Sequence, residues 1–164
     1  WGLRHREINY GTGVYVEAYN EGRSYQVTIV ESQAMRQDVV ADAAAMGRDL
    51  AEAGKTVIYG ILFDTGSAVI KPESEPALAE MAKLLKANPA LKAFIGGHTD
   101  NVGTLEANLK LSADRADALV KALGARGIAP MRLKAAGVGP YCPIASNRSE
   151  PGRAKNRRVE LVQQ

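Results

Sequence analysis

One stretch, residues 99–115, decides how this chain is interpreted: Thr-Asp-Asn-Val-Gly-Thr-Leu-Glu-Ala-Asn-Leu-Lys-Leu-Ser-Ala-Asp-Arg. It follows a short apolar run at 93–95, so Asp100 sits just past the end of a predicted strand. Gly103 provides a turn before a predicted helix, and Arg115 closes the stretch. An acid and an arginine on either side of a turn can bind a small zwitterion, the acid through the ammonium group and the arginine through the carboxylate.

Outward from this stretch, strands and helices are predicted to alternate. The apolar runs and the capping and stop signals place strands at 55–63, 91–96, 131–138 and 157–162, and helices at 74–87 and 104–123. The order βαβαβ, followed by a loop and a final strand, indicates an α/β fold in which a mixed sheet forms a two-layer sandwich with its helices. The apolar run at 55–63 is typical of a strand covered on both faces.

Residues 1–54 are predicted to form an N-terminal extension, a β-hairpin plus a helix, ahead of a domain at 55–164. Residues 13–31 alternate with period two around a turn at 20–23, as a hairpin does. Helical spacing then joins Met35, Val39, Ala43, Met46 and Leu50, and Gly54 is placed to end that helix.

The region 104–123 admits two interpretations. If it is one helix, Asn108 and Arg115 share a stripe and lie about 10 Å apart along the axis. However, the triplet starting at Ser112 has the residue types of a fresh N-cap, which predicts a short helix ending near Leu111 and a second one starting at Ser112. The second arrangement suits a zwitterion better, because it brings Arg115 into a first turn, where free backbone N–H groups also favour a carboxylate.

The stretch from Thr99 to Ala116 resembles the TD-x-x-G-x-x-x-x-N-x-x-LS-x-x-RA signature of the OmpA-like C-terminal domain family, and every fixed position is filled. The resemblance covers roughly the C-terminal two thirds of the chain. Its further motifs, in the family's order, are Ile61-Leu62-Phe63-Asp64, Ile70-Lys71-Pro72, Gly137-Val138-Gly139, and Asn147 with the run at 152–160. This family anchors outer-membrane proteins to peptidoglycan, so the resemblance implies the same fold and role here, with the split arrangement of 104–123.

In that family the acid and the arginine of the signature hold the free end of diaminopimelate in the peptidoglycan stem peptide. Carried over, they are Asp100 and Arg115. The resemblance implies that Asn108 supports the same pocket, and Asp64 and Thr65 are expected to form its opposite wall. With the turn residues added, the predicted ligand-binding set is Asp100, Arg115, Asn108, Asp64, Thr65, Thr99 and Gly103.

Purely structural roles remain open for several of these residues. Asp100 and Arg115 can form a salt bridge that fixes the loop to the helix, and Asn108 can satisfy loop backbone groups. The basic run at 153–158 is expected to fix the last strand through local pairing, with glycan contact as the alternative. Cys142 is the only cysteine, so an intramolecular disulfide is excluded, and it is expected to fill a small apolar gap.

Other functional classes have weaker support. No cofactor and no metal site are predicted, because His98 and Asp100 lack the further ligand that a zinc site needs, the only other histidine being His5. Asp64 and Asp100 do not suit glycoside hydrolysis, since nearby Arg115 would favour the ionised form of Asp100 where a general acid must be protonated. Gly137-Val138-Gly139 lacks the third glycine of a dinucleotide site.

The composition and the net charge limit the classes of partner that we expect for this chain. The net charge of +3 comes largely from the C-terminal basic run, which has no interleaved aromatic residues, so nucleic acid is not expected. No apolar run approaches the roughly 20 residues of a membrane span. Because the chain starts at Trp1 without a signal-like segment, we expect a fragment or a mature form of a longer protein.

The sequence therefore predicts a non-catalytic peptidoglycan-binding domain, periplasmic and associated with the outer membrane of a Gram-negative cell. The longer protein that contains this domain can be an outer-membrane barrel, a lipoprotein, or a motor-stator or secretion component. A protein-interaction module acting through residues 1–54 and a cell-wall hydrolase are the alternatives from other functional classes.

Overall fold

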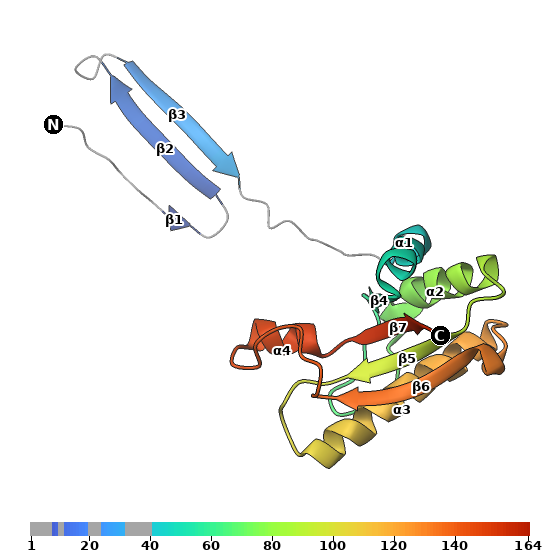
Figure 1. Ribbon diagram of the computed structural model, residues 1–164. Coiled ribbons are helices and arrows are strands. Elements are labelled where there is room, and N and C mark those ends of the chain that lie inside the picture. Colours follow the sequence, from blue (N-terminus) through green and yellow to red (C-terminus); the bar gives the residue numbers. More distant parts are fainter. Residues whose placement is uncertain (1–7, 10–11, 20–23, 32–40) are drawn as a thin grey trace. The chain divides into compact units, whose positions relative to one another are not determined.

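The computed structural model describes residues 8–9, 12–19, 24–31 and 41–164, with side chains from residue 41 onward (Figure 1). The chain divides into two compact units, Trp1–Asp38 and Val39–Gln164. The predicted boundary between 1–54 and 55–164 lies further along the chain. Which of these segments folds on its own stays a prediction.

The described part of the first unit contains the predicted hairpin. Strands β1 (Ile8–Asn9), β2 (Thr12–Tyr19) and β3 (Ser24–Glu31) form an antiparallel sheet in the order β1-β2-β3. The register runs from Thr12 opposite Glu31 to Tyr19 opposite Ser24, which confirms the pairing predicted for 13–31. The predicted turn at 20–23, and Met35 and Val39 of the helical stripe, lie outside the described residues.

Within residues 41–164, four strands form a mixed sheet. Its order is β4 (Lys55–Ile58), β7 (Val159–Gln163), β5 (Ala93–His98) and β6 (Leu133–Gly139). Strands β5 and β6 run parallel, whereas β7 pairs antiparallel with both β4 and β5. The last strand of the chain therefore enters the sheet between the first and second core strands, and the predicted mixed α/β sheet is confirmed.

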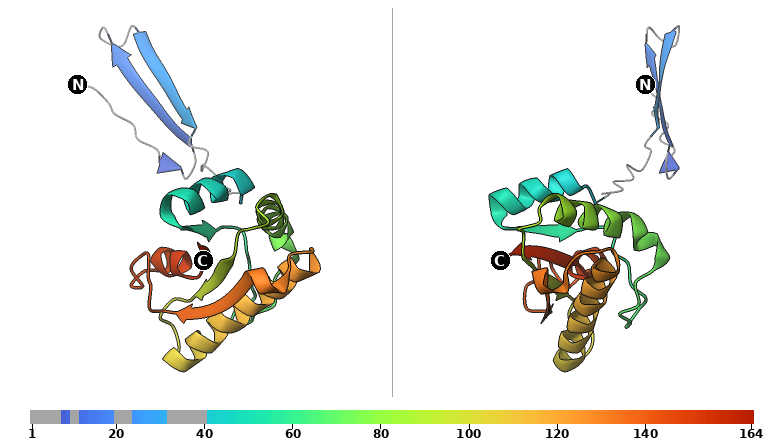
Figure 2. Two further views of the ribbon diagram at one scale, coloured as in Figure 1. Left: turned by 45° about the vertical axis from the view of Figure 1, so that its right-hand side comes forward. Right: turned by 90° about the vertical axis from the view of Figure 1, so that its right-hand side faces the viewer.

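Three helices cover one face of this sheet: α1 (Ala43–Ala53), α2 (Glu75–Ala87) and α3 (Leu105–Ala125) (Figure 2). Strand residues whose side chains face the helices alternate along each strand, so one contiguous core forms between the layers. Its largest fully buried aliphatic side chains are Met81, Leu85, Ile95, Leu119, Leu123, Ile128 and Leu161. Among the described helices, none is both long and apolar enough to cross a bilayer.

Helix α1 belongs to this layer. Asp42 caps its start by accepting from the backbone N–H groups of Ala44 and Ala45, and Gly54 ends it in a left-handed conformation with φ of 71°. Met46 and Leu50 are buried in the common core. Of the predicted stripe, Ala43, Met46 and Leu50 are therefore confirmed as the buried face of a helix that Gly54 ends.

The first core strand is shorter than predicted. It ends at Ile58 instead of Phe63, and it is an edge strand with helices on one face, so the prediction of a strand covered on both faces is wrong. A loop follows, in which Phe63 forms an isolated bridge with Ile70. Ser74 anchors that loop, because its Oγ accepts from the N–H of Leu62 at 2.8 Å and donates to the carbonyl of Leu62 at 3.2 Å. Asp64 thus lies within a loop.

The prediction of a helix break at Ser112 is also wrong, because α3 is continuous. Its N-cap is Thr104, whose Oγ1 accepts from Ala107 N–H at 3.2 Å. The Ser112 hydroxyl instead donates to the Leu109 carbonyl and accepts from the N–H of Gly139 at 3.0 Å. Helix and sheet approach so closely here that a Cβ on Gly137 would lie 2.7 Å from a backbone nitrogen of the helix. Ser112 therefore fastens α3 to β6, and Arg115 lies well inside the helix.

Candidate functional site

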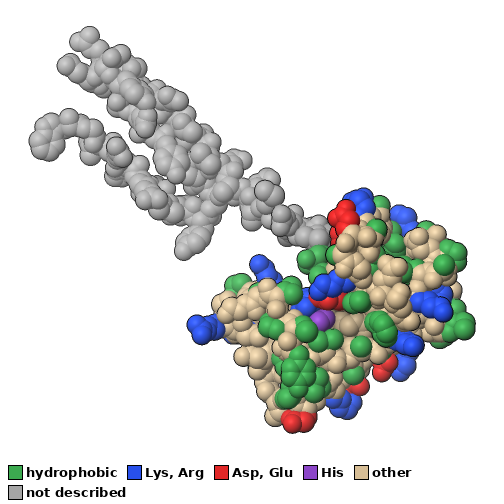
Figure 3. Space-filling view, viewed as in Figure 1, with side chains coloured by type: hydrophobic (Ala, Val, Ile, Leu, Met, Phe, Trp, Pro, Cys, Tyr) green, Lys and Arg blue, Asp and Glu red, His purple; other side chains and the backbone are tan. Residues whose placement is uncertain are grey.

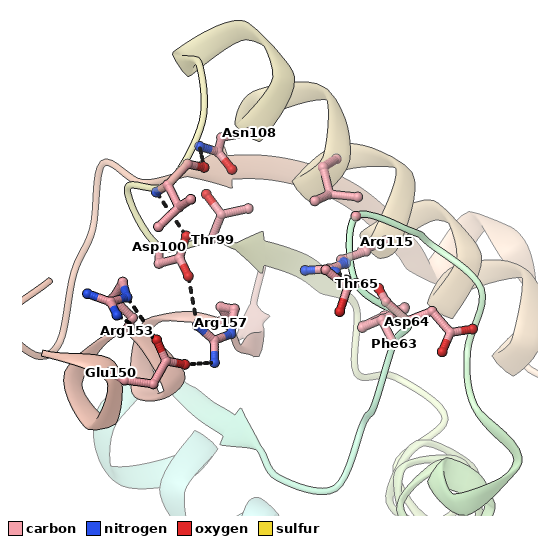
Figure 4. A pocket seen from close by; sticks show the side chains of 13 residues that line it. Phe63, Asp64, Thr65, Thr99, Asp100, Asn108, Arg115, Glu150, Arg153 and Arg157 are labelled. Carbon is pink, nitrogen blue, oxygen red and sulfur yellow. Dashed lines mark hydrogen bonds and ion pairs between the residues drawn. The ribbon is translucent and has the colours of Figure 1, made fainter.

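A cavity of about 580 Å³ opens beside the carboxyl end of β5, where the loop after β4, helix α3 and helix α4 (Glu150–Asn156) meet (Figure 4). Its lining comprises Phe63, Asp64, Thr65, Gly66, Thr99, Asp100, Val102, Asn108, Leu111, Arg115, Glu150, Arg153 and Arg157. The structure thus brings together all the predicted ligand-binding residues except Gly103. Gly103 shapes the neighbouring turn, for which its φ of 95° is suited.

Asp100 is held by two different partners. Its Oδ1 accepts from the backbone N–H of Val102 at 3.0 Å, which folds the loop back on the carboxylate. Its Oδ2 accepts from Nη1 of Arg157 at 2.8 Å. The carboxylate is only 11% exposed, yet it lines the cavity, so a ligand that enters can reach it.

Arg115 is oriented by backbone carbonyls and an aromatic ring. Its Nε donates to the carbonyl of Ser67 at 2.9 Å, and its Nη2 donates to the carbonyl of Asp64 at 3.3 Å. The guanidinium carbon lies 4.9 Å from the centre of the Phe63 ring, within cation–π range. Burial, and then the charge of Arg157, lower the pKa of Arg115, while Asp100 opposes that shift.

Among the described residues, Asp100 and Arg115 therefore do not form the salt bridge considered from the sequence. In the described part of the chain, Asp100 pairs with Arg157, and Arg115 bonds to main-chain oxygens. Each of the two side chains has its own supporting partners. A ligand can thus engage both without breaking a bond between them.

The remaining predicted residues support the walls. Asn108 is buried and its Nδ2 donates to the carbonyl of Val102 at 2.9 Å, so it does satisfy loop backbone as well as line the cavity. Thr99 is buried, and its Oγ1 has no hydrogen-bond partner among the described residues. The carboxylate of Asp64 is 60% exposed, pairs with Lys71 at 3.1 Å and points away from the other labelled groups in Figure 4. Asp64 therefore contributes its backbone to the support of Arg115.

Three charged lining residues lie outside the predicted ligand-binding set, namely Glu150, Arg153 and Arg157. Glu150 lies at the start of α4, and its two oxygens accept from Arg153 Nε at 2.9 Å and from Arg157 Nη2 at 2.7 Å. The hydrogen bonds that Arg157 donates to Asp100 and Glu150 raise the pKa of Arg157. The hydrogen bonds that Glu150 accepts from Arg157 and Arg153 lower the pKa of Glu150. The spacing of Glu150 and Arg153 by three residues was a local signal for this pair. The basic run thus pairs locally, as predicted, but it also forms one wall of the cavity.

The cavity wall contains charged groups of both signs. The carboxylates of Asp100 and Glu150 lie among three guanidinium groups, those of Arg115, Arg153 and Arg157, whereas the Asp64 carboxylate points away (Figure 4) and pairs with Lys71. A neutral ligand that carries both charges matches such a site, whereas an ion of one sign leaves opposite partners unsatisfied.

His98 lies outside this cavity, on the face of the sheet opposite the helices, beside Glu160 and Arg158. Its Nε2 is 3.8 Å from Glu160 Oε2, and Glu160 also pairs with Arg158 at 2.6 Å. Figure 3 shows the histidine set among acidic and basic side chains on that face. Burial and the charge of Arg158 lower the pKa of His98 to about 4, which keeps the ring neutral at pH 7. Within the part of the chain that the structure describes, no cluster of three metal-binding side chains is present.

Cys142, in the loop between β6 and α4, is exposed. The prediction that it fills an apolar gap is therefore wrong. Its carbonyl, rather than its thiol, has a structural role, because it accepts from Arg158 Nη2 at 3.0 Å.

The described residues 41–164 thus form an α/β sandwich with a charged cavity beside the carboxyl end of β5. Residues 62–157 match the OmpA family, and the chain belongs to that family. It is 39% identical to the probable lipoprotein YiaD of Escherichia coli K12 over 102 residues, which make up 62% of this chain and 47% of the relative. It is 43% identical to the peptidoglycan-binding protein ArfA of Mycobacterium tuberculosis over 115 residues, 70% of this chain and 35% of the relative.

A solved structure gives the same fold. The peptidoglycan-associated lipoprotein of Burkholderia pseudomallei superposes with a TM-score of 0.59 at 35% identity, covering 63% of this chain and 88% of that one. The present chain spans about a third to a half of the length of the two relatives compared by sequence.

Proposed function

We propose that this domain binds peptidoglycan and tethers a larger envelope protein to the cell wall. The observation that carries the proposal is the placement of Asp100 and Arg115 in one cavity, each held by its own partners. The printed names of ArfA and of the Burkholderia lipoprotein, peptidoglycan-binding and peptidoglycan-associated, support it.

The ligand group is proposed to be the free end of diaminopimelate in the stem peptide, where an ammonium and a carboxylate share one carbon. Each oxygen of Asp100 has two lone pairs and one protein partner in the described chain, so each has room for an ammonium proton. Arg115 has five N–H donors, of which two are used on carbonyls, so it retains donors for the carboxylate.

The other lining residues take supporting roles in this proposal. Asn108 keeps the loop around Asp100 in place and offers Oδ1 to the ligand, while the hydroxyl of Thr99 is a further group for hydrogen bonding. Thr65 and the backbone of Asp64 form the wall that holds Arg115. Gly103 permits the turn between Asp100 and α3.

In this role the domain is an anchor and performs no reaction, and it needs no cofactor. We propose a periplasmic location with attachment to the outer membrane of a Gram-negative cell. The lipoprotein names of the Escherichia and Burkholderia relatives support that location.

Co-sedimentation of the whole chain with purified sacculi that contain diaminopimelate tests the proposal. The protein is expected in the pellet, and a soluble stem tripeptide that ends in meso-diaminopimelate is expected to release it. Protein that stays in the supernatant at every sacculus concentration would contradict peptidoglycan binding. Binding that the tripeptide does not compete for would place the contact elsewhere on the polymer.

A further inference from the structure

A single carboxylate, that of Glu150, separates two of the three arginines in the cavity wall. Its Oε1 accepts from Arg157 Nη2 and its Oε2 accepts from Arg153 Nε (Figure 4). The side chain is 61% exposed, so it adds little to the core. Its position is explained better by the charges it touches than by packing.

Arg157 connects Glu150 with Asp100. One terminal nitrogen of its guanidinium donates to Asp100 at 2.8 Å, and the other donates to Glu150 at 2.7 Å. The planar fork of an arginine fixes the direction of both bonds, so the position of Glu150 also sets how Arg157 meets Asp100. Arg153 is held on the other side of Glu150 and by the Asn147 carbonyl at 3.1 Å.

We propose that Glu150 determines the specificity of the cavity for a zwitterion over a simple carboxylate. It offsets the arginine charge beside Asp100, so that an ammonium group is accepted there. The inference rests on the proposed function of the same site. Without Glu150, three guanidinium groups would surround Asp100 as the one remaining carboxylate, because the Asp64 carboxylate points away and is paired with Lys71. The cavity would then favour anions.

The test compares two soluble tripeptides that differ by one ammonium group. One ends in meso-diaminopimelate, and the other ends in 2-aminopimelate, which keeps the distal carboxylate and lacks the distal ammonium. Titration calorimetry measures the affinity of both tripeptides for the unmodified chain and for the Glu150→Gln variant. Glutamine keeps the size and an accepting oxygen, so mainly the charge changes. A unit charge several ångströms away in a partly solvated cavity should change the interaction of each charged ligand group by about fivefold, with opposite signs for an ammonium and a carboxylate.

Glu150→Gln is therefore expected to strengthen binding of the 2-aminopimelate peptide, whereas the diaminopimelate peptide loses the attraction on its ammonium group. Because the distal carboxylate is common to both peptides, their affinity ratio should shift by about fivefold toward the 2-aminopimelate peptide. Glu52→Gln on α1 is the matched control, since it removes one carboxylate far from the lining residues and should leave the ratio unchanged.

An unchanged ratio in Glu150→Gln would overturn the inference. Equal weakening of both peptides would overturn it as well, because that pattern indicates a structural role of α4. If the unmodified chain binds neither the diaminopimelate peptide nor sacculi, the proposed function itself fails, and the two failures are thus told apart.

Discussion

Arg157 donates to Asp100 at 2.8 Å across a separation of 57 residues, so the acid of the signature stretch is fixed by the residue that ends α4. Arg115, fifteen positions after Asp100 in the same stretch, is fixed by the loop after β4. The two side chains of the proposed site thus depend on different parts of the fold. Each can be removed with a separate effect on stability and on binding.

Asp100→Ala should abolish most binding at a moderate cost in stability. A charge-assisted bond to the ligand is lost, so sacculus affinity should fall at least about tenfold. The Val102 N–H loses its acceptor, but Arg157 keeps Glu150, so the free energy of unfolding should fall by about 1–2 kcal/mol. Denaturant unfolding and co-sedimentation of the same variant measure both effects.

Asp114→Ala, at an exposed acid of α3 that pairs with Lys110, is the control and should change neither quantity much. A loss above about 3 kcal/mol with binding intact would identify Asp100 as a buried structural partner instead.

The Arg115→Lys variant tests whether binding needs only the positive charge of Arg115 or also the geometry of its guanidinium group. Lysine keeps the positive charge but has no fork, so it cannot donate to the Ser67 and Asp64 carbonyls and also present two donors to a carboxylate. We expect binding to weaken about tenfold and stability to fall by about 1 kcal/mol. Arg126→Lys, beyond the last turn of the same helix, is the matched control. Full binding by Arg115→Lys would show that only the charge matters.

Sacculi with lysine in place of diaminopimelate should bind about tenfold more weakly, because lysine lacks the distal carboxylate and a bond of roughly 1.5–3 kcal/mol to Arg115 is lost. Co-sedimentation with both sacculus types at equal mass measures the difference. Equal retention on the two types would remove Arg115 from the proposed contact.

Local patterns predicted the architecture well, because alternating apolar periods reflect which face of an element meets the core. These patterns gave a wrong strand boundary where apolar residues pack against the core without belonging to a strand. Ile61 and Phe63 pack against the core from a loop, and a run of apolar residues does not distinguish that case from a strand.

Long-range contacts account for the other errors. Ser112 has the chemistry of an N-cap, but its hydroxyl is used on Leu109 and on Gly139 of the neighbouring strand. Arg157 was assigned to local pairing because nothing in its neighbourhood indicates that Asp100 lies beside it. The residues of the candidate site followed from the family resemblance, whereas their partners required the fold.

Helix α1 should be needed for a stable second unit. Met46 and Leu50 lie in the common core, so a fragment of residues 55–164 exposes the surface that they cover and loses about 1.5–3 kcal/mol for each side chain. A fragment of residues 41–164 keeps both. Denaturant unfolding should therefore give a clearly higher midpoint for 41–164. Equal midpoints would support the shorter boundary predicted from the sequence.

The stability of the domain should fall between about pH 6.5 and pH 4 because of His98. Its folded pKa of about 4 lies below the unfolded value of 6.5, so the unfolded chain takes up a proton first as the pH falls through this window. The expected loss is on the order of 2–3 kcal/mol by pH 4, and it is absent above pH 7. Burial raises the pKa of Glu160, but its hydrogen bond with Arg158 and the neighbouring positive charges outweigh this and lower it, so Glu160 adds to the loss at still lower pH.

The His98→Gln variant should flatten the dependence of the unfolding free energy on pH in this window. The His5→Gln variant, which removes the other histidine, should leave that dependence in place. If both variants keep the slope of the unmodified chain, other groups cause it, and His98 is not held neutral by its surroundings.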